Sequence, residues 1–140
     1  MKKDVQIKIT GRQFLNGESD ENVAEAVGTM ERTQSFVRIT YDENSEESGG
    51  IVQNTITYSE RGMKIEKRGA LVSDLFFVEG KQRTITYKTP YGVLQMVSHC
   101  KKMSVKEEEG MLVIRAEYDL YSGDELLSEN ITEIEVKDKI

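Results

Sequence analysis

The residues with the greatest potential for chemistry in this sequence are a histidine and a cysteine that stand side by side, His99 and Cys100. Such a pair acts in nucleophilic catalysis when the imidazole takes the proton of the thiol, so the two side chains must meet. Both residues lie in an alternating segment typical of a β-strand, where adjacent side chains point to opposite faces. We therefore predict that this pair is not catalytic, and we find no other catalytic motif.

Metal and cofactor sites are not indicated either. With one cysteine and one histidine, the chain can form no internal disulfide and no cysteine- or histidine-rich metal centre. The acidic segment 42–50 spaces Asp42, Asn44 and Glu46 like the start of a calcium loop. An EF-hand needs glycine at its sixth position, where this chain has Glu47. We predict a solvated loop here, with no metal and no cofactor.

Arg68 is a candidate for binding a ligand, because a guanidinium group stays charged and binds carboxylates through two hydrogen bonds. Its partner would be a ligand carboxylate or Glu43. The alternation of segment 63–69 places Arg68 on the polar face, which favours a surface residue or a structural ion pair. Only a local bulge near Gly69 would turn it inward.

Several polar side chains fall on the apolar faces of predicted strands. A buried hydroxyl or amide needs a hydrogen-bond partner, so these groups either line a hollow that holds water or ligand, or form a satisfied network in a filled core. The inward tyrosines are Tyr41, Tyr58, Tyr87 and Tyr118, and Asn130 shares the inward face of the last strand. The candidate ligand-binding residues are Tyr41, Glu43, Arg68, Tyr87, Tyr118 and Asn130.

Short β-strands must position these residues. Segment 63–96 contains four β-like runs separated by tight-turn signals at Gly69, Glu79-Gly80 and Pro90-Tyr91-Gly92, which predicts a meander. Further strands are predicted around residues 5–9, 22–33, 36–41, 51–58, 112–120 and 126–136. In the second of these, Gly28 favours a bulge, and one helical turn over 19–26 is the alternative. A charged turn is predicted over 106–110.

These elements predict an all-β protein. No segment keeps a 3.6-residue period over three turns, and many short strands at regular spacing are typical of a sandwich or barrel. A chain of 140 residues with 37% hydrophobic content fits one globular domain, residues 1–140. We expect a single antiparallel meander β-barrel of about eight to ten strands with little or no helix, because closure removes exposed strand edges.

A set of short motifs runs along nearly the whole chain: Tyr41-Asp42-Glu43, Arg68-Gly69, Phe77 with Gly80, the turn Tyr87-Lys88-Thr89-Pro90-Tyr91-Gly92, and later Gly110, Tyr118 and Asn130. Together they resemble the YwiB-like family, small bacterial proteins of unknown function with a calycin-like β-barrel. The resemblance implies a lipocalin-shaped barrel and implies no activity. True lipocalins carry a Gly-x-Trp signature, and this chain has no tryptophan, so lipocalin ligands are not implied.

Two hypotheses for function follow from this fold. In the first, a non-enzymatic barrel binds a small apolar or amphipathic molecule in its interior. In the second, the barrel is solid and acts as a protein-interaction module through its outer surface, where Phe76 and Val78 present apolar side chains. An interior cavity would favour the first hypothesis, and a filled interior would favour the second.

The charge and hydropathy of the chain limit its partners and location. A formal net charge of -6 leaves no basic stripe for phosphate contacts, which argues against nucleic acid. No apolar run reaches the roughly 18 residues that a membrane helix needs. Segment 1–8 lacks the apolar core of a signal peptide, so we expect a cytoplasmic protein.

We predict that this protein does not bind nucleic acid at physiological salt. Its acidic surface would repel phosphates, and few cations are clustered to release counterions. The measurement is a titration of a fluorescently labelled DNA or RNA oligomer. A micromolar complex that weakens as salt is added would contradict the prediction.

Overall fold

The structure is a computed structural model that describes residues 2–45 and 50–139. Within these ranges the chain forms ten strands and no helix. The strands are β1 Lys2–Leu15, β2 Glu18–Arg32, β3 Phe36–Ser45, β4 Gly50–Ser59, β5 Gly62–Gly69, β6 Val72–Phe77, β7 Gln82–Thr89, β8 Gly92–Glu108, β9 Met111–Ser122 and β10 Glu125–Asp138. The described residues contain no helix long and apolar enough to cross a membrane.

The strands form one closed barrel in which each strand pairs with its neighbours in sequence. The ladders are antiparallel throughout, and β1 closes the barrel by pairing with β10 on one side and β2 on the other. Closure satisfies backbone groups that an open sheet would leave at its edges. The predicted all-β meander barrel is therefore confirmed.

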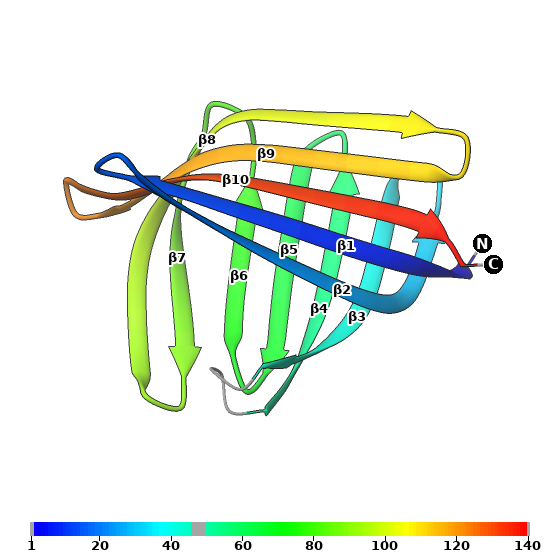
Figure 1. The fold of residues 1–140 in the computed structure, drawn as a ribbon, viewed down its shortest axis with the longest axis horizontal. Helices are drawn as coiled ribbons and strands as arrows, with labels where there is room; N and C mark the ends of the chain where they lie inside the picture. Colours follow the sequence, from blue (N-terminus) through cyan, green and yellow to red (C-terminus); the bar gives the residue numbers. More distant parts are fainter. Residues whose placement is uncertain (1, 46–49, 140) are drawn as a thin grey trace.

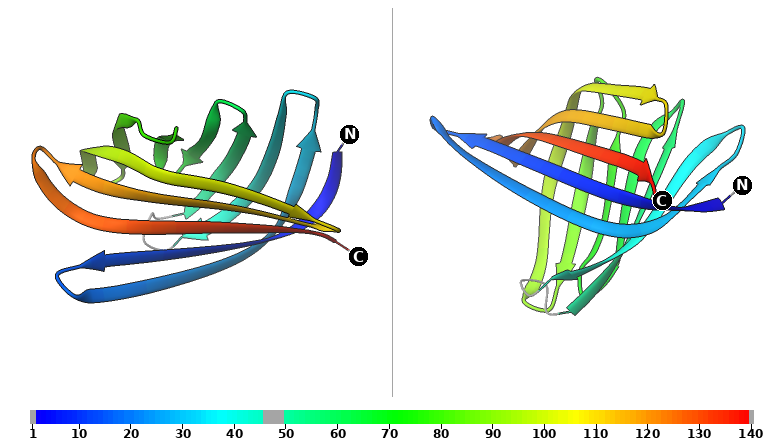
Figure 2. Two further views of the ribbon diagram at one scale, coloured as in Figure 1. Left: turned by 90° about the horizontal axis from the view of Figure 1, so that it is seen from above. Right: turned by 45° about the vertical axis from the view of Figure 1, so that its right-hand side comes forward.

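The barrel wall has two layers with different strand directions. Strands β3–β7 stand side by side, and β1, β2, β9 and β10 cross them at a steep angle (Figures 1 and 2). Strand β8 belongs to both layers, since residues 92–99 pair with β7 and residues 97–108 pair with β9. A bulge between Cys100 and Lys102 accompanies this change of partner.

Two seams of the barrel are closed by short ladders. β2 pairs with β3 through residues 28–32 and 37–41, so residues 18–27 of β2 extend beyond that ladder. The ladder between β6 and β7 consists of the pairs Val72–Lys88 and Ser73–Tyr87. The β2–β3 seam therefore joins the two layers over a short length, whereas the β6–β7 seam lies within the β3–β7 layer.

Gly28 lies at the first of these seams. A Cβ atom there would come within 2.2 Å of the Thr40 carbonyl oxygen on β3, so the close approach of the two strands requires glycine. The bulge predicted at Gly28 is wrong, because the β1–β2 register runs without a shift from Lys2 to Leu15. The alternative of a helical turn over 19–26 is also wrong, since these residues belong to β2.

Two predicted turns are shorter than expected. Residues 42–45 continue β3 and Gly50 begins β4, while residues 46–49 of the predicted acidic loop lie outside the described residues. The charged segment 106–108 remains in β8, where Glu108 pairs with Met111. In both places the hydrogen-bonded ladder continues, because exposed strand residues tolerate charge. The loop and the turn were predicted from clusters of charged residues, and such clusters do not exclude a strand.

The core is one contiguous cluster inside the barrel. Its clearest contributor is β9, where Leu112, Ile114, Ala116 and Leu120 are buried as predicted. The opposite layer contributes Ile39, Ile56 and Phe77, which are also almost completely buried. The alternation of apolar residues therefore identified the inward face of these strands correctly.

Replacing Ile114 by alanine should destabilise the barrel. Its side chain is fully buried, so the loss should be about 2–5 kcal/mol from transfer free energy and the cavity left behind. Val23→Ala is the matched control, because Val23 is 52% exposed and its truncation should cost less than about 0.5 kcal/mol. Urea denaturation of both variants provides the test, and equal losses would contradict this description of the core.

Candidate functional site

The inner face of the β3–β8 layer changes from apolar to polar between two adjacent rows of cross-strand pairs. The apolar row contains Ile39, Ile56, Ile65 and Leu75. Two residues further along each strand lies the polar row, which consists of Tyr41, Asn54, Lys67, Ser73 and Tyr87. Since side chains alternate along a strand, both rows face the interior. The change of polarity places a polar site at one end of the barrel interior.

Lys67 is the cation of the polar row. Its Nζ donates a hydrogen bond of 2.7 Å to Asn54 Oδ1 and lies 3.5 Å from Glu43 Oε1. The Lys67 side chain is 20% exposed, and that of Glu43 is 38% exposed. Asn54 is fully buried, and its Nδ2 donates to the carbonyl oxygen of Val52 at 3.3 Å and to Glu43 Oε1 at 3.5 Å. Asn54 thus holds the ammonium and the carboxylate in place.

Two phenols flank this ion pair within the polar row. Burial, followed by the negative charge of Glu43, raises the pKa of Tyr41 above its ordinary value. Burial also raises the pKa of Tyr87 to about 12, with a smaller contribution from Tyr118. Both phenols therefore remain protonated at neutral pH and can donate a hydrogen bond.

Ser73 supplies a buried hydroxyl between Lys67 and Tyr87. It is 1% exposed and pairs across the ladders with both residues. The hydroxyl is close enough to the phenol of Tyr87 to oppose the rise of its pKa slightly, but no hydrogen bond of good geometry reaches Ser73 Oγ. Leaving a buried hydroxyl without a partner costs free energy. Ser73 therefore offers hydrogen-bonding capacity to a water or a ligand.

Exposed apolar side chains gather at the same end of the barrel. The β5–β6 and β7–β8 connections lie at the lower end in Figure 1, together with the end of β3 and the start of β4. On β4 and on the β7–β8 hairpin, Ile51 is 63% exposed, Tyr91 86%, Val93 63% and Leu94 62%. We refer to these four residues as the apolar rim. Leu94 pairs with Tyr87 of the polar row, so the Leu94 side chain also lies on the inner face of the barrel.

Tyr118 and Asn130 lie deeper in the barrel and face each other across β9 and β10. The Tyr118 hydroxyl is 3.2 Å from Thr132 Oγ1, and its ring lies 4.8 Å from that of Phe77. Asn130 Nδ2 donates to the carbonyl oxygen and the Oγ of Ser128 at 3.2 and 2.9 Å. These contacts are those of a satisfied internal network.

Arg68 points away from the site. Its Nη1 lies 2.8 Å from Asp74 Oδ1 and its Nη2 3.6 Å from Glu66 Oε2, and the side chain is 46% exposed. The strand keeps its register through Gly69, so no bulge turns Arg68 inward. The cation beside Glu43 is Lys67 instead.

Sequence reasoning missed three members of the polar row: Lys67, Asn54 and Ser73. The signal for each was present, because each lies two residues from a strongly apolar position on the same strand. For Lys67 that position is Ile65, and for Ser73 it is Leu75. The alternation was used to place Arg68 outward, and the same count places Lys67 inward.

His99 and Cys100 occupy opposite faces of β8, as predicted. Cys100 is buried, whereas His99 is partly exposed. Within residues 2–45 and 50–139, no three histidine, cysteine, aspartate or glutamate side chains are close enough to hold a metal ion.

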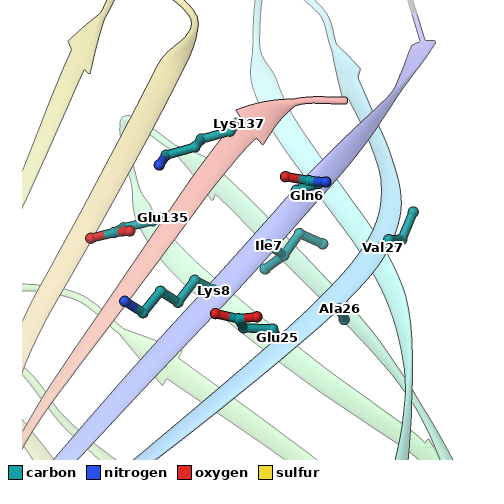
Figure 3. A pocket seen from close by; sticks show the side chains of 8 residues that line it. All are labelled: Gln6, Ile7, Lys8, Glu25, Ala26, Val27, Glu135 and Lys137. Atoms are coloured by element: carbon teal, nitrogen blue, oxygen red, sulfur yellow. The ribbon is translucent and has the colours of Figure 1, made fainter. Parts of the chain in front are cut away.

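A hollow of about 320 Å³ lies on the outside of the barrel, over β10, β1 and β2 (Figure 3). Its charged side chains alternate in sign across the strands, where Glu135 pairs with Lys8 and Lys8 with Glu25. Opposite charges on neighbouring strands stabilise a sheet modestly. Since Lys8 and Glu25 are exposed, we interpret this hollow as a solvated outer face rather than a binding site.

The described residues thus define the protein as a closed, up-and-down antiparallel β-barrel with a polar row at one end of its interior. Its family is equally clear from its sequence. The chain belongs to the DUF1934 family, described as a domain of unknown function, and the match extends over residues 7–134.

The chain is also similar to a bacterial protein and to that protein's crystal structure. The chain is 26% identical over 129 residues to the uncharacterized beta-barrel protein YwiB of Bacillus subtilis (strain 168), covering 89% of this chain and 88% of YwiB. The crystal structure of ywiB protein from Bacillus subtilis matches with a TM-score of 0.88 at 19% sequence identity, covering 99% of this chain and 94% of that one. The resemblance inferred from the sequence motifs is confirmed.

Burial of Tyr87 predicts a specific dependence of stability on pH. The folded pKa of about 12 exceeds the ordinary value of 10.0, so the unfolded chain loses the proton first. The contribution of this group is therefore complete below about pH 10 and is lost as the pH rises towards 12. Tyr41 and Tyr118 act in the same direction, because their pKa values are also raised.

Tyr87→Phe should make the fall in unfolding free energy between about pH 10 and 12 shallower. Urea denaturation at several pH values measures this slope. Tyr91→Phe serves as the control, since its side chain is 86% exposed and should leave the slope unchanged. Identical slopes for Tyr87→Phe and the parent protein would show that this phenol is not buried in solution.

Proposed function

We propose that this calycin-like barrel binds a small amphipathic molecule at the end formed by the polar row and the apolar rim. The observation that carries the proposal is the sharp change from the row of Ile39, Ile56, Ile65 and Leu75 to the polar row, next to exposed apolar side chains. Small-molecule sites typically combine apolar walls with a few convergent polar groups.

The two kinds of surface suit the two parts of such a ligand. Its polar head would meet the phenol of Tyr87, the hydroxyl of Ser73 and the Lys67–Glu43 pair. Its apolar part would cover Leu94, which is 62% exposed although it lies on the inner face. Covering this side chain would remove apolar surface from water and favour binding. The proposed site includes three of the candidates named from the sequence: Tyr41, Glu43 and Tyr87.

The alternative of a solid barrel that acts through Phe76 and Val78 is favoured by the contiguous core and by the satisfied network of Tyr118 and Asn130, but the outer apolar surface that it needs is limited. The side chains of Phe76 and Val78 are partly buried, and the guanidinium of Arg83 lies 5.1 Å from the centre of the Phe76 ring. This cation–π contact covers part of the outer apolar surface. A cytoplasmic location is part of the present proposal, and the single thiol of Cys100 is compatible with a reducing compartment.

An environment-sensitive apolar dye tests the proposed site. Leu94→Ser should weaken dye binding by removing apolar surface at the end of the polar row, with little loss of stability because the side chain is largely exposed. Val23→Ser is the matched control, since Val23 is 52% exposed but lies on β2 outside the site.

Native mass spectrometry of protein purified from its own host provides a direct complement. A retained small amphipathic molecule that is displaced by the dye is the expected result. The proposal fails if no molecule is retained and the dye binds neither the parent protein nor the Val23→Ser variant.

A further inference from the structure

The polar row points to a particular class of ligand. We propose that the amphipathic molecule is a monocarboxylate whose carboxylate binds the ammonium group of Lys67, with Ser73 and Tyr87 as further hydrogen-bond donors. This inference rests on the proposed function, because it names the chemistry of the head group at the same site.

Lys67 retains capacity to bind an anion. An ammonium group has three donor hydrogens, and one is directed to Asn54 Oδ1 at 2.7 Å. The contact with Glu43 Oε1, at 3.5 Å, is longer than the roughly 2.7–2.9 Å of a strong charge-assisted hydrogen bond. With its side chain 20% exposed, Lys67 is accessible and partly shielded from water, which strengthens its attraction for an anion.

Ser73 adds a buried hydroxyl between Lys67 and Tyr87. Its hydroxyl is almost completely buried and has no hydrogen bond of good geometry, although it lies between two polar neighbours. A carboxylate has about four lone-pair positions and can accept from several donors at once. Lys67, Ser73 and Tyr87 are cross-strand neighbours on β5, β6 and β7, so the proposal places one carboxylate against this part of the polar row.

The charges around Lys67 favour a single negative charge. Glu43 lies 3.5 Å from the ammonium, so the two residues together are neutral. A dianionic phosphate would bring a second negative charge towards Glu43, and like charges at this range repel. A cationic head group would meet the ammonium of Lys67. A monocarboxylate adds only one negative charge beside Glu43, so it meets less repulsion than a dianionic phosphate, and its apolar chain can lie against Leu94, the next residue of the same row.

The test compares four ligands with the same alkyl chain: dodecanoate, dodecanol, dodecylamine and dodecyl phosphate, each below its critical micelle concentration at neutral pH. Displacement of the bound dye gives their affinities. We expect dodecanoate to bind about tenfold more tightly than dodecanol, which is the effect of a hydrogen bond to a charged group. The amine and the phosphate should bind more weakly than dodecanoate.

Two methionine variants at neighbouring positions assign the preference. Lys67→Met removes the ammonium group but keeps an unbranched side chain one atom shorter, and it should abolish the preference for dodecanoate over dodecanol. Arg68→Met is the matched control, because Arg68 lies on the outer face of the same strand and should leave the preference intact. Ser73→Ala should lower the affinity for dodecanoate a fewfold more than that for dodecanol.

A second route avoids dependence on the folding of the lysine variant. Glu43→Gln removes the competing carboxylate from a position that is 38% exposed, and it should increase the affinity for dodecanoate. Equal binding of all four ligands, or a lysine variant that keeps the preference, overturns this inference and leaves the proposed function standing. Tighter binding of dodecyl phosphate also overturns it. Binding of none of the four ligands overturns the proposed function itself.

Discussion

Closure of the sheet by the β1–β10 ladder is the constraint on which the rest of the structure depends. Val5 to Phe14 pair without a register shift with Asp138 to Glu129, so the first and last strands lock the cylinder. Once the wall is closed, every residue of a regular ladder has either an inner or an outer position. A slip of one residue would exchange the core for charged side chains, so burial and register reinforce each other.

The same constraint creates the candidate site. The apolar row consists of Ile39, Ile56, Ile65 and Leu75. On each of these strands, the next residue that faces the interior lies two positions further towards the end of the barrel. These next positions hold the lysine, asparagine, serine and two tyrosines of the polar row. Burying such polar groups at the centre of a core costs free energy, so they lie near the end of the barrel, beside water and the apolar rim. The site is thus the point where the core ends.

The sequence predicted the fold well because alternation along strands is a local property. Leu112, Ile114, Ala116 and Leu120 could be assigned to the core without knowing their partners. Of the candidate residues named from the sequence, Tyr41 and Tyr87 lie in the polar row and Glu43 contacts it through Lys67, whereas Arg68 pairs with Asp74 and Asn130 with Ser128. Which polar residues stand side by side depends on the register between strands, and register is set by long-range pairing that a single sequence does not display.

The unpaired stretch of β2 has a consequence for how copies of this protein behave towards one another. Residues 18–27 expose backbone groups beyond the β3 ladder, and an exposed edge strand is a template for aggregation. This stretch carries Glu18, Asp20, Glu21 and Glu25 and no lysine or arginine. Two copies that approached each other edge to edge would bring these carboxylates together. Their mutual repulsion would disfavour edge-to-edge pairing of this stretch at neutral pH.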